Sequence, residues 1–262
     1  MNLQLTDKVI MVAAGSKGLG FGIAQACAQE GAIVSIASRN QVNVDMALGQ
    51  LKELGGAAHG ATIDARNKES IEAWTASVLA TYGRIDGLVV NAGGPPAGRF
   101  DDFDEQDWYD AFELTLMSAV RMIRAVLPTM RQQKHGAIVT VTSLSIKEPI
   151  DTILLSNVMR SGVVSLVKSL SKDLAKEGIR INNLVPGTIY TDRVVNLNRF
   201  RAESLGIPVE QVQTESEATI PMGRYGTIEE FGSAGAFLLS DVASYISGAT
   251  LIVDGALSKT VW

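Results

Sequence analysis

The sequence predicts an α/β protein with a doubly wound, seven-stranded parallel sheet in a single domain. Short apolar runs alternate with longer stretches of helical periodicity along the whole chain, and polar or glycine residues follow most of the apolar runs. This alternation is typical of parallel strands joined by right-handed helical crossovers. At 262 residues, 46% of them hydrophobic, the chain is long enough to bury one large core.

The apolar runs and the helical periodicity give the expected elements in order. Strands are expected at residues 9–12, 32–37, 61–63, 87–90, 137–142, 180–185 and 250–253. Helices are expected from the first glycine turn to residue 30 and at 41–54, 68–82, 105–133, 152–177 and 227–239, with Pro128 as a possible kink or break in the fourth. Residues 192–221 are polar and without clear periodicity, which predicts an irregular, mobile cover over a ligand site.

The first strand leads directly into a glycine turn, and the rest of the chain is organised around this stretch. Gly15, Gly18, Gly20 and Gly22 follow the apolar run and precede a helix. Backbone amides at a helix N-terminus attract an anion, most often a pyrophosphate, and glycine lets it approach. The dinucleotide fingerprint G-x-G-x-x-G is not met, because its third glycine would fall at Ile23.

Basic residues near the end of the second strand favour NADP(H) over NAD(H). In dinucleotide-binding folds an acid at this position binds the ribose 2′-hydroxyl, whereas an arginine suits a 2′-phosphate. Arg39 stands there, and Lys17 in the glycine turn adds a second positive charge that we expect on the same side. The sequence therefore predicts a Rossmann-type domain that binds NADP(H).

Composition excludes several other classes of function. A net charge of −5 disfavours nucleic acid or an anionic membrane as the main partner, which leaves a small molecule. The N-terminus lacks the pattern of a signal peptide and no apolar run is long enough to span a membrane, so we expect a cytoplasmic protein. Cys27 fits a packing position. His59 and His135 lack metal-ligand spacing, so no metal is expected.

Taken together, these motifs resemble the short-chain dehydrogenase/reductase family, and within it the 3-oxoacyl carrier-protein reductases. The marks are Ala14-x-x-x-Gly18-x-Gly20, Asp64, Asn91-Ala92-Gly93, Ser143, Pro186-Gly187 and Thr191, with alanine at the first glycine position of the turn. The resemblance covers nearly the whole length and implies a homotetramer, with a dimer as the alternative, joined through long helices and the C-terminal segment that ends at residues 261–262. Together with the residues above, it implies the following cofactor-binding residues: Ala14, Gly15, Ser16, Lys17, Gly18, Leu19, Gly20, Arg39, Asp64, Ala65, Asn91, Ala92, Gly93, Arg160, Gly187, Ile189 and Thr191.

The catalytic positions depart from the family pattern of asparagine, serine, tyrosine and lysine. The family spacing from Ser143 places Ser156 at the tyrosine and Arg160 at the lysine, and Thr115 takes the place of the asparagine. An arginine can still hold the ribose and keep a positive charge beside the nicotinamide. A serine is a poor general acid near neutral pH, and the loss of a positioned acid typically slows a reaction by about 10²–10⁴-fold.

Other proton donors and other functions follow as alternatives. Lys147, Asp151 and Tyr190 are candidate donors near the expected substrate pocket, and an iminium substrate would need no proton. The first hypothesis is an NADPH-dependent oxidoreductase that reduces a carbonyl or imine by an atypical mechanism, with Ser143, Ser156, Arg160 and Thr115 as its catalytic group. The second is a non-redox or regulatory NADP(H)-binding protein on the same scaffold. A third reading is that NADP(H) does not bind at all.

Overall fold

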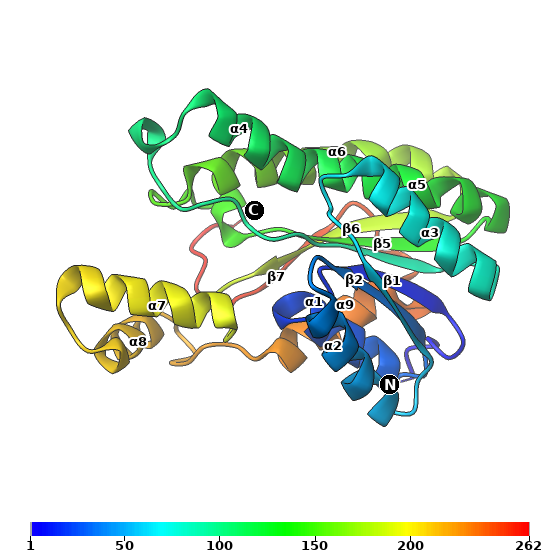
Figure 1. The fold of residues 1–262 in the computed structure, drawn as a ribbon, viewed down its shortest axis with the longest axis horizontal. Helices are drawn as coiled ribbons and strands as arrows, with labels where there is room; N and C mark the ends of the chain where they lie inside the picture. Colours follow the sequence, from blue (N-terminus) through cyan, green and yellow to red (C-terminus); the bar gives the residue numbers. More distant parts are fainter. Residues whose placement is uncertain (1, 262) are drawn as a thin grey trace.

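A single parallel sheet forms the centre of the molecule in the computed structural model, which describes residues 2–261 (Figure 1). Its strands lie in the order β3-β2-β1-β4-β5-β6-β7, and every pairing is parallel. The strands are β1 (Val9–Ala13), β2 (Ile33–Ser38), β3 (Ala58–Thr62), β4 (Gly87–Val90), β5 (Gly136–Val141), β6 (Ile179–Pro186) and β7 (Thr250–Val253). The predicted fold is confirmed, with β3 earlier than expected.

Helices cover both faces of this sheet (Figure 1). One face carries α1 (Gly18–Gln29), α2 (Gln41–Glu53) and α9 (Ile228–Leu239), and the other carries α3 (Lys68–Tyr82), α5 (Ser118–Gln133) and α6 (Leu154–Lys176). The central strands β1 and β4 are covered on both faces, so they are apolar and buried throughout, as parallel strands in such sheets usually are, whereas the edge strands β3 and β7 are only partly buried.

Glycines bring two helices on one face into unusually close contact. A Cβ at Gly22 of α1 would collide with the backbone of Ile228 in α9, and a Cβ at Gly232 of α9 would collide with the backbone of Gly22. Gly22 therefore serves helix packing and lies outside the ligand-binding part of the turn. Cys27 of α1 is buried in the same core, and burial raises the pKa of its thiol to about 12.

The helix expected at 105–133 begins and ends at the predicted residues, but a π-helical turn divides it into two α-helices. It consists of α4 (Glu105–Ala111), a π-helical turn at Phe112–Met117, and α5, which continues through Pro128. Pro128 was the expected kink or break, but the irregular turn lies earlier. A π-turn places one extra residue in the helix and often marks a functional site. Here that turn carries Thr115, one of the predicted site residues.

Residues 192–221 were expected to be irregular, and this prediction is wrong. They form α7 (Asp192–Leu205) and α8 (Val209–Ala218), which extend from the sheet as a separate pair (Figure 1). Thr191 caps α7 by accepting a hydrogen bond from the amide of Val194, and Gly206 ends the helix in a left-handed conformation. The helices bury few residues, chiefly Ala202 and Val212, so their apolar periodicity is weak.

Within residues 2–261, none of the helices has the length and apolar character that a membrane crossing would require. Val261, at the end of the described chain, is exposed. The neighbouring Trp262, which belongs to the C-terminal segment predicted to join subunits, lies outside the described residues.

Candidate active site

A cavity of about 580 Å³ lies at the carboxyl ends of the strands, beside the neighbouring strands β1 and β4, after which the chain continues toward opposite edges of the sheet. Ligands of doubly wound sheets bind at this switch point. The loops after β1, β2, β4, β5 and β6 all contribute to its wall, together with α7. The predicted site residues in its lining are Ala14, Ser16, Lys17, Gly18, Leu19, Arg39, Asp64, Ala65, Asn91, Ala92, Gly93, Ser143, Ser156, Arg160, Gly187, Ile189 and Thr191.

The turn after β1 leaves the first amides of α1 facing this cavity. Lys17 stands at the N-cap of α1 and provides no side-chain cap, whereas α2, α3 and α7 are each capped by Asn or Thr. Ala14 and Gly18 both have positive φ, at 47° and 55°, so the turn uses two left-handed residues. Uncapped amides at a helix N-terminus are suited to bind phosphate oxygens.

Two predicted residues of the turn, Gly15 and Gly20, lie outside the cavity lining and serve close packing. A Cβ at Gly15 would press on the carbonyl of Val12 and on Ile36, and one at Gly20 would collide with the carbonyl of Ala14. Their contribution to a ligand site is therefore the shape of the turn.

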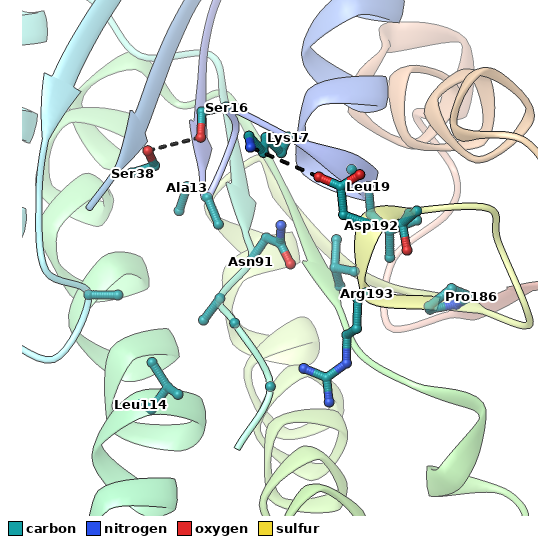
Figure 2. Close-up of a pocket in the computed structure, with 18 of the residues that line it drawn as sticks. Ala13, Ser16, Lys17, Leu19, Ser38, Asn91, Leu114, Pro186, Asp192 and Arg193 are labelled. Carbon is teal, nitrogen blue, oxygen red and sulfur yellow. Dashed lines mark hydrogen bonds and ion pairs between the residues drawn. The ribbon is translucent and has the colours of Figure 1, made fainter. Parts of the chain in front are cut away.

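Lys17 and Arg39, the expected pair of cations, both line the cavity. Lys17 Nζ lies 3.9 Å from the carboxylate of Asp192 of α7, and both side chains are exposed (Figure 2). Arg39 lines the cavity after β2 and makes no ion pair with the part of the chain that the structure describes. Asp64, after β3, is held by Arg66 at 2.8 Å, and hydrogen bonds from Arg66 lower the pKa of its carboxyl.

Ser143, Ser156 and Arg160 meet at the other end of the cavity. Ser156 and Arg160 lie one turn apart on α6, and Arg160 Nε donates a hydrogen bond to Ser156 Oγ at 3.1 Å. Ser143, after β5, accepts from the amide of Ser145 at 3.2 Å. Since both serine oxygens act as acceptors in these bonds, both hydroxyl protons can be donated to a bound molecule.

The Arg160 guanidinium also joins α6 to the end of β5 by hydrogen bonds. Its Nη1 donates to the carbonyls of Val141 and Thr142 at 2.9 and 3.2 Å, while Nη2 has no hydrogen-bond partner among residues 2–261. Burial and the nearby positive charge of Arg193 lower the pKa of Arg160 to about 10. The guanidinium therefore remains charged at neutral pH, and Nη2 is the part left to bind a ligand.

Thr115 lines a second, small cavity behind this group. The cavity measures about 10 Å³ and is also lined by Asn91, Ser118 and Arg160. The Thr115 hydroxyl is buried and has no hydrogen-bond partner in the described part of the chain. Buried hydroxyls are normally satisfied, and a polar cavity of this size is about the minimum for one water.

The alternative proton donors are placed elsewhere. Lys147, Asp151 and Tyr190 are absent from the described lining of the large cavity. His59 accepts or donates a hydrogen bond with Ser35 inside the sheet region, and His135 lies 3.6 Å from Asp241. No group of three or more potential metal ligands occurs among the described residues.

Comparison with known proteins identifies the family. A family model described as enoyl-(acyl carrier protein) reductase matches residues 13–258. The chain belongs to the short-chain dehydrogenase/reductase family. The match covers the site as well as the fold, since it runs from the end of β1 past β7.

Several members of the short-chain dehydrogenase/reductase family align over almost the whole chain. Human dehydrogenase/reductase SDR family member 4 is 33% identical, covering 96% of this chain and 87% of that protein. The 3-oxoacyl-[acyl-carrier-protein] reductase FabG of Chlamydia muridarum is 31% identical over 98% of this chain and its own full length. L-sorbose reductase of Gluconobacter frateurii, solved with NADPH and L-sorbose, is 28% identical, with a TM-score of 0.95 and full coverage of both chains.

The structure also brings residues into this short-chain dehydrogenase/reductase site that the sequence did not indicate. Arg193, Gly94, Ile153 and Leu197 line the cavity beside the predicted group. Arg193 could have been found from the sequence, because it lies two residues after Thr191, a predicted site residue. It was missed because residues 192–221 were expected to be irregular.

Proposed function

We propose that this protein is an NADPH-dependent oxidoreductase that reduces a carbonyl or imine, with Ser156 and Arg160 in place of the family's tyrosine and lysine. The observation that carries the proposal is the joint position of Ser143, Ser156 and Arg160 in the cavity that also receives the uncapped start of α1. A hydride acceptor and a dinucleotide can share that cavity. Several relatives are reductases, which supports the same class of reaction.

The residues present fit NADP(H). The amides at the start of α1 suit the pyrophosphate, and Lys17 adds a charge at the same place. Arg39 suits the 2′-phosphate, since it lines the cavity and makes no ion pair among residues 2–261. Asp64 and Ala65 would lie beside the adenine, and Arg160 Nη2 would hold the ribose next to the nicotinamide. Bound NADPH would supply the hydride.

The two serines and the arginine then stabilise the oxygen that becomes negative. Ser143 and Ser156 donate hydrogen bonds to the substrate carbonyl oxygen, which polarises the carbon toward hydride. Negative charge develops on that oxygen in the transition state, and preorganised donors at such a position typically contribute several kcal/mol. Arg160 strengthens Ser156 as a donor, because its Nε–H already binds the serine oxygen.

Protonation is the slow part of this scheme. Ser156 passes its proton to the alkoxide, the Arg160 charge stabilises the serine oxygen that has lost it, and water returns a proton to the serine. A water in the small cavity beside Thr115 would connect Arg160 to the interior polar groups there. We expect turnover about 10²–10⁴-fold below that of an enzyme with a matched general acid.

The direct test follows absorbance of reduced nicotinamide in the presence of ketones, β-ketoesters, quinones and imines. We expect consumption of NADPH with at least one class, lost in Ser156→Ala and Ser143→Ala. Ser161→Ala is the matched control, because Ser161 is exposed on the same helix and outside the cavity lining. NADPH binding without turnover on any member of the panel would instead support the non-redox alternative.

The double variant Ser156→Tyr with Arg160→Lys separates the two readings further. If it creates carbonyl reductase activity that the native protein lacks, the native site is not a reductase. If the native protein is active and the exchange lowers that activity, Ser156 and Arg160 have a chemistry of their own. Absence of any NADPH binding by calorimetry would contradict both.

Two further properties belong to the same proposal. We propose a homotetramer in the cytoplasm, with a small molecule as the substrate. We also propose that the whole chain is one NADP(H)-binding domain, in which α7 and α8 act as a movable cover. Sedimentation of the purified protein tests the assembly, and protection of α7 from hydrogen exchange on addition of NADPH tests the cover.

A further inference from the structure

Arg193 is a cation of the large cavity that the scheme above does not use. It is the second residue of α7, and it makes no ion pair or hydrogen bond within residues 2–261. Its guanidinium lies against the backbone of Gly94, where a Cβ would collide with it. Gly94 follows Asn91-Ala92-Gly93 after β4, so Arg193 reaches across the cavity to the loop on its far side.

Adjacent residues of α7 point to different ends of the cavity (Figure 2). Asp192 turns toward Lys17 at the glycine turn, which is the end suited to the pyrophosphate. Arg193 turns away from Lys17. Its positive charge is close enough to lower the pKa of Arg160, whose Nε holds Ser156. Arg193 therefore lies at the end of the cavity where the reacting carbonyl would bind.

The acidic residues of the cavity are already paired, so they leave these arginines without counter-charge. Asp64 is held by Arg66, and Asp192 by Lys17. Arg160 and Arg193 both line the cavity, and the same lining includes the apolar side chains of Leu114, Ile153 and Leu197. Arg160 is partly buried and Arg193 is exposed, and the positive charge of Arg193 acts on Arg160. Like charges repel, and an anion beside them relieves that repulsion.

We propose that Arg193 binds a carboxylate of the substrate, so that the molecule reduced is a small oxo acid with an apolar body. This inference rests on the proposed function and names its substrate class. A guanidinium matches a carboxylate by two parallel hydrogen bonds, which fixes orientation as well as affinity. The carbonyl of the same molecule would then face Ser143 and Ser156.

The test compares acids with their own esters. Acetoacetate and methyl acetoacetate form one pair, and benzoylformate and methyl benzoylformate form another. In the wild type we expect kcat/KM to favour the acid in at least one pair. Arg193→Met should lower kcat/KM for that acid by about 10- to 100-fold, the usual value of a charged hydrogen bond, and should change kcat/KM for its ester by less than about threefold.

Arg199→Met is the matched control, because Arg199 is exposed on α7 and outside the cavity lining.

Two results would overturn the assignment. Equal losses for acid and ester would make Arg193 a general structural residue. A weaker Kd for NADPH in Arg193→Met, large enough to explain the kinetic loss, would assign Arg193 to the cofactor.

A binding measurement keeps this proposal separate from the proposed reductase activity. Calorimetry with protein saturated with NADP⁺, which carries no hydride, measures acetoacetate binding without turnover. If acetoacetate binding requires Arg193 and no substrate is reduced, the result would support the anion site and contradict the proposed reductase activity. If esters and acids are reduced alike and acid binding is unchanged in Arg193→Met, the result would support the reductase activity and contradict the anion site. Neither binding nor turnover would contradict both.

Discussion

At the level of single residues, Arg39 carries the proposed preference for the phosphorylated cofactor. Lys17 was expected to add a second charge there, and it lies 3.9 Å from Asp192, whereas Arg39 makes no ion pair among residues 2–261. Arg39→Ser should therefore raise the Kd of NADPH by about 10- to 100-fold, the loss expected for a charge-assisted contact with phosphate. The Kd of NADH should stay within about threefold, as calorimetry with both cofactors will measure. A parallel loss for NADH would place Arg39 in general binding.

The residues around the reacting oxygen also set an expected pH dependence. The lining of the large cavity, as far as the structure describes it, contains no histidine, cysteine or tyrosine. Burial and the charge of Arg193 lower the pKa of Arg160 to about 10, so its proton is retained below that pH and lost as pH rises through it. We expect kcat/KM to vary less than about threefold between pH 6 and 9 and to fall above about 10.

A clear limb between pH 6 and 9 would contradict this assignment and indicate a different proton donor. Arg160→Met is the control, because it removes the guanidinium whose pKa is lowered by burial and by the charge of Arg193. The kcat/KM of this variant should be low, and it should not fall further above about pH 10.

At the level of elements, the close contact of α1 and α9 depends on two glycines. A Cβ at Gly232 would meet the backbone of Gly22, and no rotamer change can relieve a collision with backbone. Gly232→Ala should lower the free energy of unfolding by about 1–3 kcal/mol, as overpacking in a core does. Urea unfolding measures the change.

Gly49 provides the opposite case for the same substitution. It is exposed within α2, and a Cβ there would meet nothing within 4 Å. Gly49→Ala should raise the free energy of unfolding by about 0.5–1 kcal/mol, because alanine loses less chain entropy in a helix. If both substitutions had the same sign, the packing argument for Gly232 would be wrong.

The π-helical turn between α4 and α5 places Thr115 against the cavity behind Arg160. Valine has nearly the same shape as threonine, so Thr115→Val removes the hydroxyl and keeps the packing. With a water bound to that hydroxyl, we expect the free energy of unfolding to fall by about 0.5–1.5 kcal/mol, the net value of one hydrogen bond. The kcat should fall as well, because the same water would serve Arg160. Thr75→Val is the control, since Thr75 is buried in α3 with its hydroxyl bonded to Ile71.

The elements also show what the sequence can and cannot predict. Strands such as β1 and β4 were predictable because strands buried on both faces are continuous apolar runs. The turn after β1 was predictable from its glycines, because Gly18 is left-handed and a Cβ at Gly15 or Gly20 would collide with neighbouring backbone. The pair α7 and α8 was missed because these helices bury few side chains, so local capping by Thr191 and Gly206 defines α7 more than its apolar pattern does. The π-turn leaves no comparable mark in the residue types.

Side-chain direction within the site was the least predictable feature. Spacing correctly placed Ser156 and Arg160 one turn apart, and their hydrogen bond agrees with that register. It could not show that Arg160 also binds the carbonyls of Val141 and Thr142, because those contacts depend on how α6 lies over β5. The predicted grip on the ribose therefore stays a prediction that rests on Nη2 alone.

At the level of the whole molecule, the site exists only when the entire sheet is assembled. Arg39, Asn91, Ser143 and Gly187 come from four different strand ends, and the chain between the first and the last of them forms most of the fold. A ligand that binds this site therefore binds the folded protein and not the unfolded chain. Its binding energy must add to the global free energy of unfolding.

This linkage gives an expected thermal shift. NADP⁺ at about 100 times its Kd should add about 2.7 kcal/mol, which for a chain of this size corresponds to a rise in Tm of about 5–10 °C. NAD⁺ at the same concentration should give a smaller rise, and Arg39→Ser should remove most of the difference between the two cofactors. Equal shifts with NADP⁺ and NAD⁺ would show that the 2′-phosphate is not recognised. No shift with either would contradict a dinucleotide site in this cavity and with it every step proposed for Arg160.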